Sequence, residues 1–230
     1  RPQKVMSAGD NWAGKGRGIE QQYLLNTTAD AVQIWKVREN DIRPLSTGTY
    51  AAGQLLKNVT KDERGNRVVE FKDKAGQVIL KKSEIMGNAA DGHNNWLCTY
   101  YVYDDLGMLR CVIPPKAVTA IKSNWNTNFA VDIARELCFI YRYDERNRMI
   151  MKQVPGADSV EMVYDVRDRL VFTRDGNLKQ KTPKQWLVIF YDGLNRPTMT
   201  ALYNSAATRE TLQASMNTAT GNTQSISYNV

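Results

Sequence analysis

The sequence has little of the chemistry that most catalytic and metal sites use. It contains one histidine, His93, and three cysteines, Cys98, Cys111 and Cys138, none of them in a Cys-x-x-Cys pair. A catalytic triad would have to use His93, and a zinc site would have to combine it with widely separated thiols. The odd cysteine count excludes complete internal disulfide pairing. Because His93 lies in a polar, turn-like stretch, we expect it in an exposed loop, and we expect no catalytic residue, no metal site and no cofactor.

Long apolar runs and dense basic runs are also missing. No segment approaches the ~18 apolar residues of a transmembrane helix. The net charge of +7, from 31 Lys+Arg and 24 Asp+Glu, makes polyanions possible partners. The densest basic stretch is only Lys15-Gly16-Arg17, and its glycine flanks lack the spacing of a phosphate-binding loop. No helix-turn-helix, zinc-finger or RNA-recognition signature is found, so nucleic acid is not an expected partner.

The remaining composition is that of a folded protein. The chain has 230 residues, 42% hydrophobic and 24% charged, which suits one large domain or two small ones. It begins at Arg1 without an apolar signal segment and ends in a polar tail. We therefore interpret it as an internal piece of a longer protein, with further parts of the same polypeptide as its main partner.

A short motif recurs along the chain. Its pattern is Asp, two variable residues, then Gly, Asn or Asp, and in four copies a tyrosine precedes the aspartate. The copies are Asp62 with Gly65, Asp73 with Gly76, Tyr103-Asp104 with Gly107, Tyr143-Asp144 with Asn147, Tyr164-Asp165 with Asp168, and Tyr191-Asp192 with Asn195.

This pattern predicts hairpin turns. Aspartate is favoured at the first position of a type I turn, where its carboxylate accepts backbone N–H groups ahead of it. The residue three positions later must often be left-handed, which Gly, Asn and Asp tolerate best. We therefore interpret the motif carboxylates as structural turn residues and not as pairs of catalytic acids.

The flanking segments predict strands. β-branched and aromatic residues precede and follow the turns, for example at 97–103, 137–143 and 186–191. The motif spacing predicts a meander with strands near 55–60, 67–72 and 78–83, a loop at 155–158, and a longer loop at 174–184. The tyrosine before each aspartate is expected to face the core, and the arginines beside the turns are expected to face solvent.

Helical patterns interrupt the strands in a few places. Pro115–Lys122 starts with proline at a favoured position, and Asn128–Glu136 has apolar residues at helical spacing. A third helix is predicted at Ala206–Met216, and Tyr228 is predicted to begin another strand. We expect an arm or loop at 1–22, a repeat region at 23–203 with a helical insertion near 115–137, and a helix with a truncated tail at 204–230.

The repeated motif resembles the YD repeats of Rhs proteins. The resemblance covers roughly residues 23–203 and is strongest at the copies beginning with Tyr143, Tyr164 and Tyr191, where arginine follows the turn. It implies a mainly β fold, in which repeated antiparallel hairpins build a shell-like sheet, with two or three short helices. It also implies a large bacterial protein, secreted or on the cell surface, whose shell can enclose a toxin domain. A recognisable cleavage motif or toxin domain is absent from residues 1–230.

Two functions follow as expectations. The first is a structural segment of such a β-shell, used for encapsulation or cell-surface interaction. The alternative is a module that binds glycans or other polyanions, because aromatic residues accompany a set of basic side chains beside the turns. Those side chains are Arg146, Arg148, Arg167, Arg169 and Arg196. An enzyme is not expected.

Overall fold

The computed structural model describes residues 3–6, 8–11, 13–39, 41–87 and 89–219. The chain divides into two compact units, residues 1–139 and residues 140–230. The division falls inside the segment 23–203 that the sequence suggested as one repeat region. The predicted strand at Tyr228 lies outside the described residues.

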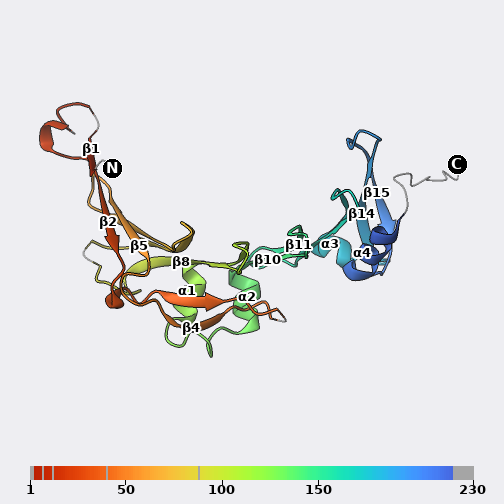
Figure 1. Cartoon of the computed structure of the whole chain (residues 1–230), viewed down its shortest axis with the longest axis horizontal. Coiled ribbons are helices and arrows are strands. Elements are labelled where there is room, and N and C mark those ends of the chain that lie inside the picture. Colours follow the sequence, from red (N-terminus) through yellow and green to blue (C-terminus); the bar gives the residue numbers. More distant parts are fainter. Residues whose placement is uncertain (1–2, 7, 12, 40, 88, 220–230) are drawn as a thin grey trace. The chain divides into compact units, whose positions relative to one another are not determined.

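Unit 1 contains a meander of antiparallel strands (Figure 1, red to green). Its strand order is β1-β2-β5-β6-β7-β8-β9. The bounds are β1 (Lys4–Val5), β2 (Ile19–Leu25), β5 (Leu56–Lys61), β6 (Arg67–Lys72), β7 (Val78–Glu84), β8 (Trp96–Tyr103) and β9 (Leu109–Ile113). Strands β5, β6 and β7 agree with the predicted strands to within one residue. β1 and the start of β2 lie in the segment 1–22 that was expected to be an arm or loop; β1, with two residues, is too short to leave a periodic signal.

A smaller layer covers part of this sheet. It consists of the hairpin β3 (Gln33–Lys36) and β4 (Leu45–Thr49), with α1 (Pro115–Ile121) and α2 (Val131–Leu137). Two short 3₁₀ turns, η1 (Ala13–Lys15) and η2 (Thr28–Asp30), complete the unit. Helix α1 begins with Pro115, whose missing N–H has no partner at a helix start anyway. Both helices lie in the helical insertion predicted near 115–137, and α1 packs against both β8 and α2 (Figure 1).

The core of unit 1 lies between that layer and the sheet. Tyr100 is fully buried and its hydroxyl accepts the backbone N–H of Gln33, 3.0 Å away. Trp35 meets the rings of Tyr100, Trp125 and Phe129 edge-on, at centroid distances of 5.8 to 5.9 Å. These contacts join the β3–β4 hairpin and the segment between the helices to strand β8.

Unit 2 repeats the hairpin plan with its own core. Its strands follow the order β10 to β15, with a helix after β13 and another after β15. The bounds are β10 (Phe139–Tyr143), β11 (Met149–Gln153), β12 (Val160–Tyr164), β13 (Leu170–Arg174), α3 (Gly176–Gln180), β14 (Gln185–Tyr191), β15 (Pro197–Asn204) and α4 (Arg209–Thr218). Trp186, Phe172 and Val163 pack together, and Leu212 of α4 joins them.

The mainly β, antiparallel fold class is confirmed, but the helix content is larger than predicted. Within the described residues there are four α-helices instead of two or three. The additional helix is α3, so the prediction of a plain loop at 174–184 is wrong. Asp175 caps it, because its carboxylate accepts the N–H of Leu178 at 2.8 Å. Helix α4 begins three residues after the predicted start, because Thr208 is its N-cap.

Candidate functional site

The six motif copies lie at the turns between consecutive strands. In each, the aspartate carbonyl accepts the N–H of the residue three positions later, at 2.9 to 3.1 Å. That residue has a positive φ, between 60° and 93°, in all six turns. Most of these turns add a register shift beside the aspartate, which is the bulged hairpin that a left-handed residue closes.

The motif carboxylates are used by their own turns. Asp165 Oδ1 accepts the N–H groups of Arg167 and Arg169 at 2.9 and 3.0 Å. Four other copies repeat this pair of bonds, those of Asp62, Asp104, Asp144 and Asp192. Burial tends to raise the pKa of Asp165, but the hydrogen bonds from Arg169 and the backbone outweigh it and lower the pKa. Asp165 therefore stays ionised and holds its turn.

In unit 2, arginine connects each turn to the next motif copy. Arg169 Nε donates to Asp165 Oδ2 at 2.7 Å, and its Nη1 reaches Asn195 Oδ1 of the next turn at 3.0 Å. Its guanidinium carbon lies 4.8 Å from the ring centroid of Tyr191, the tyrosine that precedes that turn. The Tyr191 hydroxyl donates to the carbonyl of Leu170 at 2.8 Å. Three different contacts thus fix one copy against the next.

The preceding pair of copies repeats this arrangement. Arg148 binds Asp144 at 2.8 Å and Asp168 of the next turn at 2.8 Å. It lies 4.9 Å from the ring centroid of Tyr164, whose hydroxyl donates to the carbonyl of Met149 at 2.7 Å. We call these repeated contacts the turn ladder. In unit 1, Gln77 occupies the corresponding position and donates to the Gly107 carbonyl of the next turn at 3.1 Å.

The prediction that the turn arginines are solvated is wrong for two of them. The side chains of Arg148 and Arg169 are only 13% and 10% exposed, because each lies on a ring and between two turns. The motif tyrosines Tyr103, Tyr143, Tyr164 and Tyr191 are half-buried. Arg196 follows the last turn, and its side chain is 72% exposed while it pairs with Asp192 at 2.7 Å. Within the described residues, no ring contact is formed by Arg196.

His93 is not the exposed loop residue that we expected. It is half-buried, its Nε2 lies 2.6 Å from the Tyr100 hydroxyl, and its ring stacks on Tyr100. Burial, with Lys82 and Lys122 nearby, lowers its pKa to about 4, so it is neutral at pH 7. All three cysteines are buried and unpaired. Across the part of the chain that the structure describes, no three His, Cys, Asp or Glu residues are grouped to hold a metal ion.

Glu84 anchors the loop that follows β7. Its side chain is 1% exposed and accepts from Arg67 Nε at 2.9 Å, Arg67 Nη2 at 2.7 Å and the N–H of Ala89 at 2.8 Å. The Arg67 hydrogen bonds outweigh burial and lower the Glu84 pKa from 4.5 to about 2. Sequence reasoning missed this pair, because its partners lie on different strands and are 17 residues apart.

We expect the Glu84–Arg67 pair to make the free energy of unfolding decrease at acidic pH. With the folded pKa below the unfolded one, the ionised Glu84 stabilises the fold fully above pH 4.5, and this contribution is lost as the pH falls toward about 2. Glu84→Gln should therefore lower the free energy of unfolding at pH 7 and flatten its pH dependence in that window. Urea unfolding between pH 2 and pH 7 measures both. Glu70→Gln, at a more exposed ion pair, is the matched control, and an unchanged acid slope in Glu84→Gln would contradict the expectation.

Comparisons with known proteins give partial structural similarity. No family model and no curated protein matches the sequence. In the crystal structure of TcdB2-TccC3-Cdc42, a chain is 16% identical with a TM-score of 0.49, covering 66% of this chain and 7% of that one. A chain of the Photorhabdus luminescens Tc holotoxin pore is 12% identical with a TM-score of 0.48, covering 89% and 10%. A chain in the structure of TcdB2-TccC3-TEV is 14% identical with a TM-score of 0.48, covering 83% and 9%.

The chain therefore spans only 7 to 10% of the length of these solved chains. Similarity at this level does not assign the chain to a family. Within the described residues, no helix is both long and apolar enough to span a bilayer.

Proposed function

We propose that this chain is a structural segment of a β-shell in a longer protein that is secreted or held at the cell surface. Its hairpins form the wall, and its main partner is further hairpins of the same polypeptide. The turn ladder carries the proposal. The contacts from Arg148 and Arg169 each fix one motif copy to the next, so the repeated residues serve the assembly of neighbouring hairpins.

The edge of unit 2 supports a wall that continues. Within the described residues, β15 pairs with β14 alone, and Leu202 and Tyr203 on it are 59% and 48% exposed. Exposed apolar edge strands favour pairing with another strand. Arg196 stands at the same edge with its guanidinium mostly open to solvent. A further copy of the motif would place its tyrosine on Arg196, as Tyr191 lies on Arg169.

A structural role is favoured over a catalytic one and over binding at the turn arginines. The motif carboxylates hold backbone N–H groups, and Arg148 and Arg169 are committed to carboxylates and rings. A glycan- or polyanion-binding module stays a prediction from sequence, and among the residues that suggested it the exposed ones are Arg146, Arg167 and Arg196.

The test compares the isolated 230-residue chain with the full-length protein purified from its native cell. Hydrogen exchange, read by mass spectrometry, should be faster at Thr200–Leu202 in the isolated chain, because among the described residues no strand pairs with the outer side of β15 there. β13 should exchange equally in both samples, because it has a strand on each side, and it serves as the internal control. Equal exchange of β15 in the two samples would contradict the proposal.

A further inference from the structure

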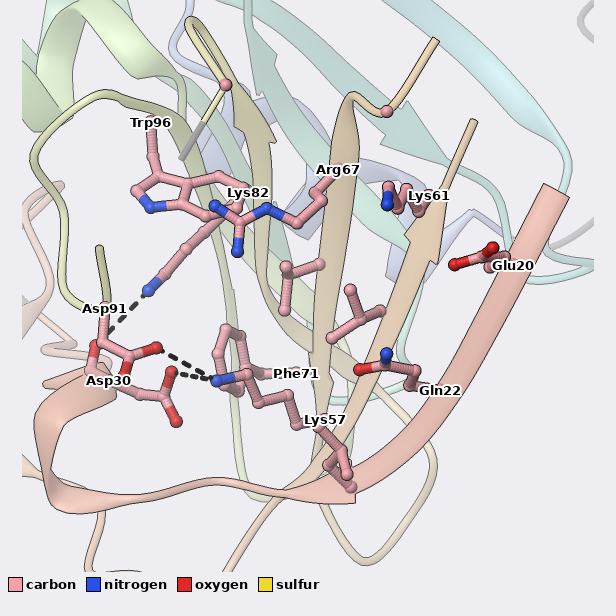
Figure 2. Close-up of a pocket in the computed structure, with 15 residues that line it drawn as sticks. Glu20, Gln22, Asp30, Lys57, Lys61, Arg67, Phe71, Lys82, Asp91 and Trp96 are labelled. Atoms are coloured by element: carbon pink, nitrogen blue, oxygen red, sulfur yellow. Dashed lines mark hydrogen bonds and ion pairs between the residues drawn. The ribbon is translucent and has the colours of Figure 1, made fainter. Parts of the chain in front are cut away.

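One face of the unit 1 sheet is hollowed into a cavity of about 600 Å³ (Figure 2). Three rows of cross-strand neighbours form its floor. The rows are Leu24, Lys57 and Phe71; Gln22, Val59, Val69 and Lys82; and Glu20, Lys61 and Arg67. Asp30, Asp91 and Trp96 complete its rim. Because these side chains come from four adjacent strands, the cavity belongs to the folded sheet and not to one loop.

Cations and aromatic rings alternate on this floor. Lys82 is central, with its ammonium 5.1 Å from the Phe71 ring centroid and 5.9 Å from that of Trp96. Lys57 lies 5.7 Å from Phe71 on one side, and Arg67 lies 5.2 Å from Trp96 on the other. Cation–π contacts of this kind strengthen as water is excluded.

Two of the three cations, Lys57 and Arg67, form ion pairs with buried carboxylates. Lys57 pairs with Asp30 at 2.7 Å, and Arg67 pairs with Glu84, each acid being 1% exposed. Among the described residues, Asp91 is 56% exposed and forms its ion pair with Lys57, at 3.3 Å (Figure 2).

Lys82 lacks such a partner. It is 2% exposed and donates to the backbone carbonyls of Gly92 at 2.6 Å and Asp30 at 3.5 Å, but among the described residues no carboxylate lies within ion-pair distance of it. A buried cation without an opposite charge is costly, and binding an anion would relieve that cost. Burial lowers the pKa of Lys82 in agreement with this, although the nearby Asp30 and Asp91 charges oppose the effect.

We propose that this cavity binds a small organic carboxylate, with its charged group at Lys82. The body of the ligand lies along Leu24, Val59 and Val69, which make part of the floor apolar. The volume is that of a cavity for a small organic molecule and far exceeds a bare inorganic anion. Asp91 occupies the mouth as an exposed, displaceable competitor for the cations.

The experiment titrates the folded chain with benzoate and with benzamide, its neutral counterpart of nearly equal shape. The readout is the indole N–H resonance of Trp96, which donates to the Ala90 carbonyl at the rim. Benzoate should saturate and benzamide should bind at least about tenfold more weakly, because only the carboxylate meets the ammonium. Equal binding of the two, binding of inorganic phosphate as tight as that of benzoate, or no saturable benzoate binding would overturn the proposal.

Three variants locate the site. Lys82→Met keeps the length and apolar stem and removes a buried charge, so it should fold while losing at least about tenfold in benzoate affinity. Lys81→Met is the matched control, because Lys81 is adjacent in β7, faces the opposite side and is 44% exposed. Asp91→Asn should bind benzoate about two- to fivefold more tightly. Unchanged affinity in Lys82→Met, or weaker binding in Asp91→Asn, would overturn the assignment. Each of the two variants tests it separately, so one unstable variant leaves the other as a test.

Discussion

Replacing Arg169 with alanine is expected to lower the free energy of unfolding by about 2–4 kcal/mol. The substitution removes the ion pair with Asp165, the hydrogen bond to Asn195 and the contact with the Tyr191 ring together. It leaves the Asp165 carboxylate in a site where its residue is 9% exposed. Breaking a buried pair on one side costs about 3–5 kcal/mol, and here the remaining backbone N–H groups reduce that cost. Urea unfolding at pH 7 measures it.

Arg196→Ala is the matched control inside the same chain. Arg196 has the same position in the motif and the same pairing with an aspartate four residues earlier, at 2.7 Å. Because its side chain is 72% exposed, its loss should cost less than about 1 kcal/mol. Equal costs for the two arginines would show that the turn ion pair alone matters, and would remove the argument that the ladder couples neighbouring hairpins.

A double-mutant comparison separates the ring contact from the ion pair. If the ladder couples copies, Arg169→Met and Tyr191→Leu together should cost less than the sum of the two single changes, by about 0.5–2 kcal/mol. The Tyr191 hydroxyl bond to Leu170 is lost in both backgrounds, so it does not enter the difference. The coupling therefore reports the stacked pair itself, which is the contact that a further motif copy would make with Arg196.

The fold was more accessible to sequence reasoning than the contacts between its parts. A turn is decided within five residues, so the aspartate and the left-handed position leave a readable local pattern, as at Asp144 and Asn147. The ladder depends on strand register, which brings Arg148 to a tyrosine 16 residues later. Sequence therefore indicated a basic residue beside the turn, but not the ring and carboxylates that bury it.

The buried surroundings of His93 and the cavity around Lys82 could not be predicted from the sequence for the same reason. The neighbours of His93 in sequence are polar, and only the fold places the Tyr100 hydroxyl 2.6 Å from its ring. In sequence, Lys82 lies between Lys81 and Ser83, and these polar neighbours suggest a lysine exposed to solvent. Its burial follows from Phe71 and Trp96 on neighbouring strands. A single sequence carries the period of each strand, but not which strand lies beside it.

Trp186→Ala is expected to cost about 3–5 kcal/mol and to release α4 from unit 2. Trp186 is fully buried, meets Phe172 edge-on at 6.4 Å, and lies in one cluster with Leu212 of the helix. Removing a buried tryptophan leaves a cavity that the surrounding side chains fill only partly. Urea unfolding gives the stability, and hydrogen exchange at residues 209–218 reports whether the helix is still docked.

Trp186→Phe is the milder variant, which tests whether an aromatic ring at this position is enough to keep α4 docked. It keeps an aromatic partner for Phe172 and removes an indole N–H that, within the described residues, is buried without a hydrogen bond. Its cost should be only about 1–2 kcal/mol, and α4 should stay protected.

Helix α4 is also held to β12 by side-chain hydrogen bonds, so the exchange of α4 in Trp186→Ala shows which contact docks the helix. Gln213 accepts the N–H of Tyr164 at 3.0 Å and donates to its carbonyl at 2.7 Å, taking the place of a neighbouring strand. If α4 remained protected in Trp186→Ala, this amide pair would be what holds the helix, and Gln213→Ala would then release it. If α4 exchanges freely, the apolar cluster is what docks it, because two hydrogen bonds at one residue cannot replace the buried surface of Trp186 and Leu212.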